Sequence, residues 1–337
     1  MRLNSRGREL RFFVFAQGRW WNVLTDRPKT NSFALAGLLL AACWLCAPAS
    51  ARTIEQPTRT VVDETGRVVR VPARIERIIT LAPSLTEIVY ALGLEDRLVG
   101  VTNQCDHPPA AQQKPRVGDV INPNLEMIVE LKPDVVLGSK VDNLSKTVEA
   151  IEHLGVPLYG LYPTTVQGVL DSIRHIAELA GVAERGAALA GRLQAQLREL
   201  QTRLEQTSTA KPRLLFVVWV DPLIVVGGGT FLSDALTQAG GVSVSAGLRG
   251  NWPRLSLEEV VELDPDFLVL PRSHGLNTRM ANLSQREPWN HLRAVRQNRV
   301  IWIDAAIERP GPRIVAVIEQ LAQALHPQLA PAEVAAQ

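Results

Sequence analysis

Two stretches, NLEMIVELKPD at residues 124–134 and SLEEVVELDPD at residues 256–266, determine the architecture of this chain. They agree at seven of their eleven positions. Each opens with a good helix N-cap residue, continues with apolar residues at helical spacing, and ends at Pro-Asp before a short apolar run. The pattern predicts a helix that leads into a buried strand, which is the repeating unit of an α/β sheet.

The single duplication predicts two similar α/β lobes. A solenoid would need at least three copies at a shorter period. Coincidence is the alternative, because Pro-Asp before an apolar strand is frequent in α/β proteins. The glutamates at matching positions, Glu126 and Glu258, favour the duplication.

An apolar run near the N-terminus predicts export. The run occupies residues 33–46, with Arg27 and Lys29 just before it, and Ala49–Ala51 fits a small-x-small cleavage signal. The run is shorter than the roughly 20 apolar residues that a membrane span needs. We therefore predict a signal peptide over residues 1–51, removed by cleavage, and a mature protein in the periplasm.

Other ways of processing this segment stay open. Leu40–Cys43 is similar to a lipoprotein signal, so a lipid anchor at Cys43 ranks second, because Trp44–Cys46 prolongs the apolar run past it. An uncleaved membrane anchor ranks third. The charged leader before the run is long, and a start at Val23 would shorten it.

Composition argues against a nucleic-acid partner. Seven of the 36 basic and two of the 34 acidic residues lie in residues 1–51, so the remainder carries a net charge of −3. It contains no cluster of basic residues interleaved with aromatic ones. Of three cysteines only Cys105 survives cleavage, which excludes an internal disulfide. A lone cysteine of this kind is more often a small buried apolar residue than a ligand.

The positions of turn residues and apolar runs predict the helices and strands of the N-terminal lobe. Residues 59–71 alternate around a turn signal, which indicates a hairpin, and residues 78–81 form a buried strand. Ser84 and Glu87 have the spacing of a capping box that opens a helix ending at Leu92. The other expected elements are strands at 98–101, 135–137 and 157–161, and helices at 124–131, 143–154 and 166–179.

A stripe of leucines predicts one long helix at residues 183–206, ended by a polar break. The stripe suits either an amphipathic core helix or a rigid bridge between the lobes. The expected domains are an N-terminal lobe at 52–182, a bridging helix at 183–211 and a C-terminal lobe at 212–337. The expected elements of this last lobe are strands at 214–220, 267–270 and 300–303, a Gly227–Gly229 turn, helices at 231–239 and 312–325, and the helix of the second repeat within residues 256–266.

The order of several motifs resembles the periplasmic iron-siderophore/cobalamin-binding proteins of ABC importers, most of all the vitamin B12-binding branch. The motifs are IITLAPSLTE at 78–87, CDHPP at 105–109, the first repeat, GGGTF at 227–231, Trp252-Pro253 and ERPGPR at 308–313. The resemblance covers most of residues 58–327. It implies two α/β lobes joined by one long helix, a ligand cleft between them with little hinge closure, and a monomer that delivers its ligand to an ABC importer.

Ligands of open α/β sheets lie beyond the carboxyl ends of the strands, and this rule selects the candidate binding residues. They are Pro83, Ser84, Gln104, Cys105, Asp106, Trp219, Thr230, Trp252 and Arg309. Trp252 lies in a Gly-rich loop, where a flat indole suits the face of a macrocycle. Trp219, inside an apolar strand, suits the core equally well. Arg309, beside Glu308, offers a fixed polar contact to amide or phosphate groups.

The resemblance implies a corrinoid ligand, with a ferric siderophore or haem as the nearest alternatives. Gln104, Val120 and Ser139 stand where the cobalamin branch has rings, which leaves the ligand open. In the family, glutamates that match Glu126 and Glu258 dock onto the two membrane subunits of the importer. A carboxylate in the first turn of a helix is also favoured by the helix dipole alone.

Enzyme signatures are missing from the sequence. It contains no Gly-x-Ser-x-Gly elbow, no phosphate-binding Gly-x-x-x-x-Gly-Lys-[Ser/Thr] loop and no His-Glu-x-x-His. A three-histidine metal site is not evident, and no cofactor is expected. A chelatase-like enzyme built from His107, His274 and a carboxylate is the alternative from another class of protein.

Overall fold

The structure is a computed structural model that describes residues 57–140, 143, 145–207, 210–273, 283–285 and 287–329. The strands of the N-terminal lobe are β1 (Thr58–Val62), β2 (Val68–Pro72), β3 (Ile78–Thr80), β4 (Leu98–Val101), β5 (Val135–Ser139) and β6 (Leu158–Leu161). Its helices are α2 (Pro83–Ala91), α3 (Leu125–Glu130), α4 (Ser145–His153) and α5 (Val166–Leu179), with 3₁₀ turns η1 (Glu95–Arg97) and η2 (Pro109–Gln113).

The long helix α6 (Ala183–Glu205) leads into the C-terminal lobe. The strands there are β7 (Arg213–Val220), β8 (Leu223–Val225), β9 (Val242–Ser243), β10 (Phe267–Pro271) and β11 (Val300–Ile303). The helices are α7 (Phe231–Gln238), α8 (Leu257–Leu263), α10 (Arg293–Arg296) and α11 (Ile314–Leu325), with 3₁₀ turns η3 (Leu283–Gln285), η4 (Trp289–His291), η5 (Ala305–Glu308) and η6 (Pro327–Leu329).

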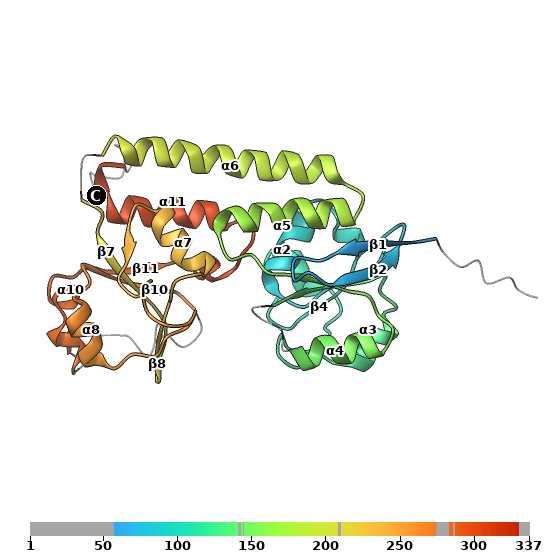
Figure 1. Ribbon diagram of the computed structural model, residues 1–337, viewed down its shortest axis with the longest axis horizontal. Coiled ribbons are helices and arrows are strands. Elements are labelled where there is room, and N and C mark those ends of the chain that lie inside the picture. The colour runs from blue at the N-terminus through green and yellow to red at the C-terminus, as the bar shows by residue number, and fades with distance from the viewer. Residues whose placement is uncertain are drawn as a thin grey trace, which may run out of the picture. The chain divides into compact units, whose positions relative to one another are not determined.

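Each lobe is built on one sheet (Figure 1). The first sheet is parallel, with strand order β4-β3-β5-β6, and the second has the order β11-β10-β7-β8, with β9 also paired to β7. The fold class of two similar α/β lobes is therefore confirmed. The expected helices and strands lie within two residues of their predicted bounds, whereas β8, β9 and α10 were not predicted.

One hydrophobic core serves both lobes. Alternate residues of the central strands point to opposite faces of their sheets. Ile78 of β3 and Leu214 of β7 face the shared core, whereas Ile79 and Leu215 face separate cores of their own lobes. Residues 56–337 accordingly form a single compact unit.

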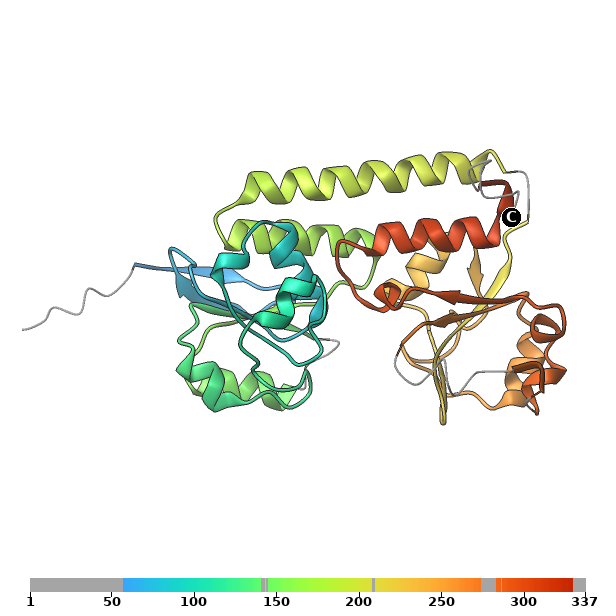
Figure 2. The same cartoon turned by 180° about the vertical axis from the view of Figure 1, so that it is seen from behind.

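Helix α6 contributes to this shared core and spans both lobes. Figures 1 and 2 show it running along α5 and then along α11. Leu189, Leu197 and Leu200 are buried, and Leu193 and Leu204 pack against the same cluster. The leucine stripe is thus both an amphipathic core surface and a bridge, so the two interpretations hold together.

The aspartate that closes each repeat anchors the strand behind it. The Asp134 carboxylate accepts hydrogen bonds from the backbone N–H groups of Glu76 (2.7 Å) and Arg77 (2.8 Å), just before β3. The Asp266 carboxylate accepts from the backbone N–H of Arg213 (2.8 Å), at the start of β7. Each repeat therefore fixes its strand against a neighbouring strand of the same sheet, β5 against β3 and β10 against β7.

The arginine at each of these joints also reaches the end of the repeat helix. Arg77 donates to the carbonyl of Leu131 (2.7 Å), and Arg213 donates to the carbonyl of Leu263 (2.7 Å). A helix end leaves carbonyl groups without intrahelical partners, and a cation there is also favoured by the helix dipole. In both lobes the repeat therefore has the same structural role, which is to connect its helix and its strand to the neighbouring strand of the sheet.

The capping box predicted for α2 is wrong. The helix begins at Pro83, with Ala82 as its N-cap and no capping side chain. Proline is pre-organised for the first helical position, so the helix starts before Ser84 can cap it. The Glu87 side chain, only 2% exposed, instead binds residues of the other lobe.

Candidate ligand-binding site

A pocket of about 170 Å³ lies between the two lobes, at the carboxyl ends of strands. The N-terminal lobe contributes the segment after β5 and the segment after β6, and the C-terminal lobe contributes the start of α7 and the loop before α8. The lining residues are Lys140, Tyr162, Pro163, Thr164, Gly229, Thr230, Phe231, Asn251 and Trp252. Of the predicted site residues, the pocket brings together Thr230 and Trp252.

A glycine turn positions the loop that carries Trp252. The backbone N–H of Gly227 donates to the carbonyl of Asn251 (2.9 Å), and a Cβ atom at Gly227 would lie 2.1 Å from the carbonyl oxygen of Gly250. Only glycine permits this approach of two backbones. Gly229 follows with φ +74°, which completes the turn predicted from the sequence. Trp252 remains 40% exposed at the edge of the pocket.

Thr230 lines the pocket, but its hydroxyl is engaged within the protein. The Oγ1 atom accepts from the backbone N–H of Ser233 (3.1 Å) and donates to the carbonyl of Gly227 (3.1 Å). These bonds cap α7 and tie it to the glycine turn. Thr230 therefore shapes the wall of the pocket, and its hydroxyl is not free to bind a ligand.

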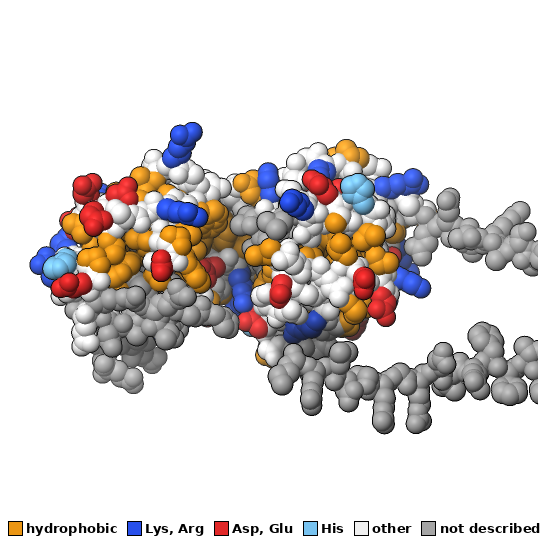
Figure 3. Space-filling view, turned by 90° about the horizontal axis from the view of Figure 1, so that it is seen from below, with side chains coloured by type: hydrophobic (Ala, Val, Ile, Leu, Met, Phe, Trp, Pro, Cys, Tyr) orange, Lys and Arg blue, Asp and Glu red, His pale blue; other side chains and the backbone are white. Residues whose placement is uncertain are grey.

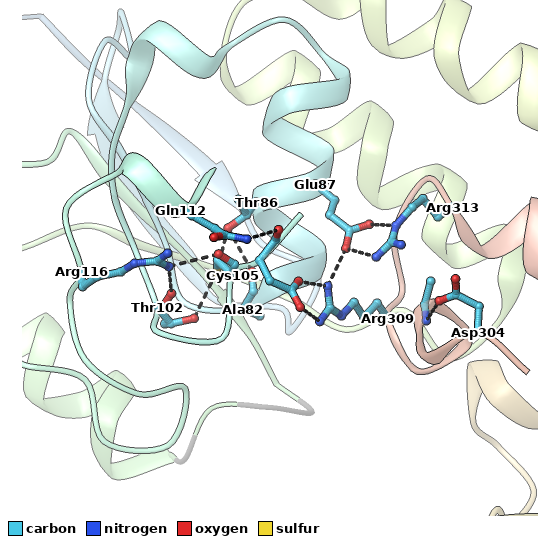
Figure 4. Close-up of polar contacts among 12 residues, drawn as sticks. Ala82, Thr86, Glu87, Thr102, Cys105, Gln112, Arg116, Asp304, Arg309 and Arg313 are labelled. Atoms are coloured by element: carbon cyan, nitrogen blue, oxygen red, sulfur yellow. Dashed lines mark hydrogen bonds and ion pairs between the residues drawn. The ribbon is translucent and has the colours of Figure 1, made fainter. Parts of the chain in front are cut away.

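Arg309 lies in an ion-pair network that joins the lobes (Figure 4). Its guanidinium donates to the carboxylate of Asp106 (2.6 and 3.2 Å) and to that of Glu87 (3.1 Å). Arg313 donates twice more to Glu87, at 2.7 and 2.8 Å. A buried carboxylate is costly unless it is paired and hydrogen-bonded, and here both partners of Glu87 come from the opposite lobe.

The network shifts the pKa values of its members. Burial by itself would lower the pKa of Arg309, but the hydrogen bonds to Asp106 and Glu87 outweigh it and raise that pKa. The hydrogen bond from Arg309 in turn lowers the pKa of Asp106. The charged forms are thus mutually stabilised. The contacts predicted between ligand and both Arg309 and Asp106 are replaced here by contacts between the lobes.

Ser84 and Cys105, also predicted to bind the ligand, both have buried side chains. Ser84 is 2% exposed and lies beneath the segment of Gly311, where a Cβ atom would be 3.4 Å from the carbonyl oxygen of Ser84. The Cys105 thiol is fully buried and contacts the hydroxyls of Thr86 (3.0 Å) and Thr102 (3.2 Å). Cys105 is therefore a core residue, and neither side chain faces the pocket.

The remaining predicted residues lie outside the lining of the pocket. Pro83 is the partly exposed first residue of α2. Gln104 is exposed and donates to the carboxylate of Asp119 (3.1 Å). Trp219 is 40% exposed, so it is not a core residue, and its indole N–H donates to the carbonyl of Asp221 (2.8 Å).

The chelatase alternative gains no support from the described part of the chain. His274 lies outside the described residues, so its pairing with His107 is not seen. Where the chain is described, no three His, Cys, Asp or Glu side chains gather into a group that could hold a metal ion.

Within the same residues, no helix is long and apolar enough to cross a membrane.

The sequence missed Lys140, Tyr162, Glu87 and Arg313 as site residues. Lys140 and Tyr162 follow β5 and β6, so the strand-end rule contained the signal, but only the structure shows that the Lys140 Nζ lies 4.4 Å from the centre of the Tyr162 ring. The Glu87–Arg313 pair joins residues 226 positions apart, and no local pattern marks it.

Two α/β lobes, a spanning helix and a pocket lined by both lobes are the architecture of a bilobal solute-binding protein. A model of the periplasmic binding protein family matches residues 78–307, and the chain belongs to this family. A vitamin B12-binding protein of Vibrio parahaemolyticus is 31% identical over 248 residues, which cover 73% of this chain and 88% of the relative. The uncharacterized ABC transporter substrate-binding lipoprotein YvrC of Bacillus subtilis is 29% identical over 304 residues, covering 87% and 95%.

Solved structures show the same fold. The periplasmic vitamin B12-binding protein BtuF of Vibrio cholerae matches with a TM-score of 0.67 and 28% identity, over 74% of this chain and 96% of that one. A periplasmic haem-binding protein of Pseudomonas aeruginosa matches with a TM-score of 0.68 and 26% identity, over 76% and 95%. The fold is therefore shared by proteins whose names specify different ligands.

The network at Glu87 predicts a large and specific loss of stability. Glu87→Ala leaves two partly buried arginines without their shared partner, and we expect it to lower the free energy of unfolding by about 2–4 kcal/mol. Glu319→Ala is the matched control, because it breaks the half-exposed pair with Arg203 and should cost less than about 1 kcal/mol. Urea unfolding measures both variants. Equal losses would show that the pairing of Glu87 contributes no more than a surface ion pair.

Burial of Glu308 predicts a pH-dependent stability. Burial raises the pKa of its carboxyl group from 4.5 to about 7, although a hydrogen bond with Ser273 and the charge of Arg309 oppose the shift. Because the folded-state pKa is the higher one, the stabilisation from this group is full below about pH 4.5 and is lost as the pH rises through 7.

Glu308→Gln should therefore match the wild type near pH 4.5 and be the more stable protein at pH 8. The gain at pH 8 should be about 3 kcal/mol. Urea unfolding at the two pH values tests this, and a difference that is the same at both would contradict the raised pKa.

Proposed function

We propose that this chain is an exported solute-binding protein that captures a corrinoid between its lobes and delivers it to an ABC importer. The observation that carries the proposal is the pocket lined by both lobes, with the rings of Tyr162 and Trp252 in its wall. Aromatic faces suit flat macrocycles. At about 170 Å³ the pocket is smaller than the 300–1,000 Å³ typical of pockets that enclose a whole ligand, so it would hold one edge of a macrocycle.

Haem is the second candidate. The named relatives and solved structures include both vitamin B12-binding and haem-binding proteins, at similar identity and similar TM-score. Both ligands are flat, metal-containing macrocycles, so ring-lined walls serve either one. A ferric siderophore remains the third candidate. Membership of a family of binding proteins supports capture and release of the ligand over the chelatase-like alternative.

Export and anchoring form part of the proposal. The first 51 residues, which lie outside the described residues, would direct the chain to the periplasm and be removed. The Bacillus subtilis relative is named a lipoprotein, which supports the alternative of a lipid anchor at Cys43.

The two copies of the repeat supply the proposed contact with the importer. Glu126 and Glu258 are exposed in the first turns of α3 and α8, and no described residue pairs with either carboxylate. Three positions further, on the same helical face, Val129 and Val261 are 43% and 49% exposed. The helix dipole accounts for a first-turn glutamate but does not account for an exposed valine beside it at both sites.

The proposed docking surface thus consists of two similar patches, each a carboxylate next to an apolar side chain. Figure 3 views the face on which α3 and α8 lie, where acidic and hydrophobic side chains occur on both lobes. A permease with two-fold symmetry offers the same surface twice. A single chain can meet it symmetrically only if it carries two similar patches, and the duplication provides them.

Ligand binding should depend on Trp252. Trp252→Ala should weaken corrinoid binding by about 1–3 kcal/mol if the ring packs on the ligand. Trp219→Ala is the matched comparison, because that ring is equally exposed but does not line the pocket, and it should change the affinity little. Calorimetry with cobalamin and cobinamide measures both variants. Unchanged affinity in Trp252→Ala would remove this residue from the site, and no corrinoid binding in the wild type would move the proposal to haem or a ferric siderophore.

Delivery should depend on the paired glutamates. Glu126→Ala/Glu258→Ala should keep the fold and the ligand affinity but lose uptake and ligand-stimulated ATP hydrolysis with the cognate importer in liposomes. Glu184→Ala/Glu199→Ala is the control, because these glutamates are exposed on α6, away from α3 and α8, and give the same change of net charge. Full uptake with the first double variant would reduce Glu126 and Glu258 to helix-start carboxylates.

A further inference from the structure

Lys140 gives the pocket between the lobes a positive charge that no acidic lining residue balances. It is the cationic member of the lining, and the nine lining residues include no Asp or Glu. Its ammonium lies 4.4 Å from the centre of the Tyr162 ring, within the range of a cation–π interaction. Among the described residues, no carboxylate forms an ion pair with Lys140.

The Lys140–Tyr162 pair stands on a rigid base. The backbone N–H of Lys140 donates to the carbonyl of Leu161 (2.9 Å), which ties the end of β5 to the end of β6. The backbone N–H of Tyr162 donates to Glu64 Oε2 (2.8 Å), and Glu64 Oε1 bonds with the ring of His175 (2.9 Å). These bonds fix the backbone from which the Lys140 and Tyr162 side chains project, and a site whose backbone is fixed before binding loses less entropy when a ligand arrives.

The guanidinium of Arg309, which the sequence predicts as a polar contact for the ligand, is already paired within the protein. Arg309 is held by the carboxylates of Asp106 and Glu87, so its positive charge is already compensated within the protein. The charge of Lys140 has only a ring beneath it. A ligand group in the pocket would therefore meet the field of Lys140 rather than that of Arg309.

We propose that this pocket is a subsite for an anionic group, a carboxylate or a phosphate, at the edge of the captured macrocycle. Lys140 is its charge partner, the Asn251 side chain is in reach as a neutral hydrogen-bonding group, and the rings of Tyr162 and Trp252 flank the part of the ligand next to the anion. The proposal rests on macrocycle capture and adds that macrocycles with an anionic group at the edge bind more tightly than those without one. An uncharged amide gains less from an ammonium than an anion does, because only the anion adds a charge–charge attraction to the hydrogen bond.

The test uses ligand pairs that share a macrocycle and differ in the anionic group. One pair is haem and its dimethyl ester, which lacks the free carboxylates, and the other is cobinamide phosphate and cobinamide. In at least one pair the wild type should bind the charged member about tenfold more tightly, and the pair that responds identifies the source of the anion. Lys140→Gln should abolish the difference between the charged and the uncharged member, and Lys140→Arg should retain most of it.

Lys146→Gln is the control for the loss of one positive charge, because Lys146 is exposed on α4 and outside the lining of the pocket. It should leave the difference intact. Higher salt should reduce the tenfold preference in the wild type and not in Lys140→Gln. If a macrocycle binds but Lys140→Gln affects both members of each pair equally, or neither, the anion subsite is overturned while macrocycle capture stands. If no macrocycle binds the wild type, macrocycle capture fails and the subsite fails with it.

Discussion

The buried carboxylate of Glu87 fixes the site on which every proposal depends. It lies in the middle of α2, where it is 2% exposed, and its partners Arg309 and Arg313 both belong to the opposite lobe. A charge buried in this way is tolerated only while its partners stay in place. Separation of the two lobes would therefore expose or strand charge, so this pairing, together with the shared core and α6, holds the lobes that line the pocket.

The duplicated repeat separates residues needed by the fold from residues left for a partner. Asp134 and Asp266 anchor strands, and the apolar positions fill cores, so their identity in both copies has a structural cause. No comparable cause applies to the exposed glutamates or to the exposed valines beside them. The identities that the fold does not require are those that a symmetric partner would select, which is why the repeat supports a docking surface as well as a fold.

Local patterns predicted the elements well but misassigned several side chains. Apolar spacing and turn residues placed α6 and both repeat helices within two residues of their observed bounds. Ser84 and Glu87 have the spacing of a capping box, but the helix starts at Pro83, so Ser84 is inside it and does not cap it. Glu87 instead pairs with Arg313, which is 226 positions away in the sequence. Such pairs arise from the packing of two lobes, and no window along the chain contains both members.

The proposed site fits two of the ligands named among similar proteins, vitamin B12 and haem, which share a flat metal macrocycle and differ in the groups around it. A pair of ring-bearing walls would accept the shared part. Discrimination then has to come from what meets the edge of the ring. In the proposed site that edge would meet Lys140 beside the Tyr162 ring, because Arg309, the arginine predicted for this role, is held between Glu87 and Asp106. The ion pairs between the lobes therefore occupy Arg309 and leave Lys140 as the cation that the proposed site offers to a ligand.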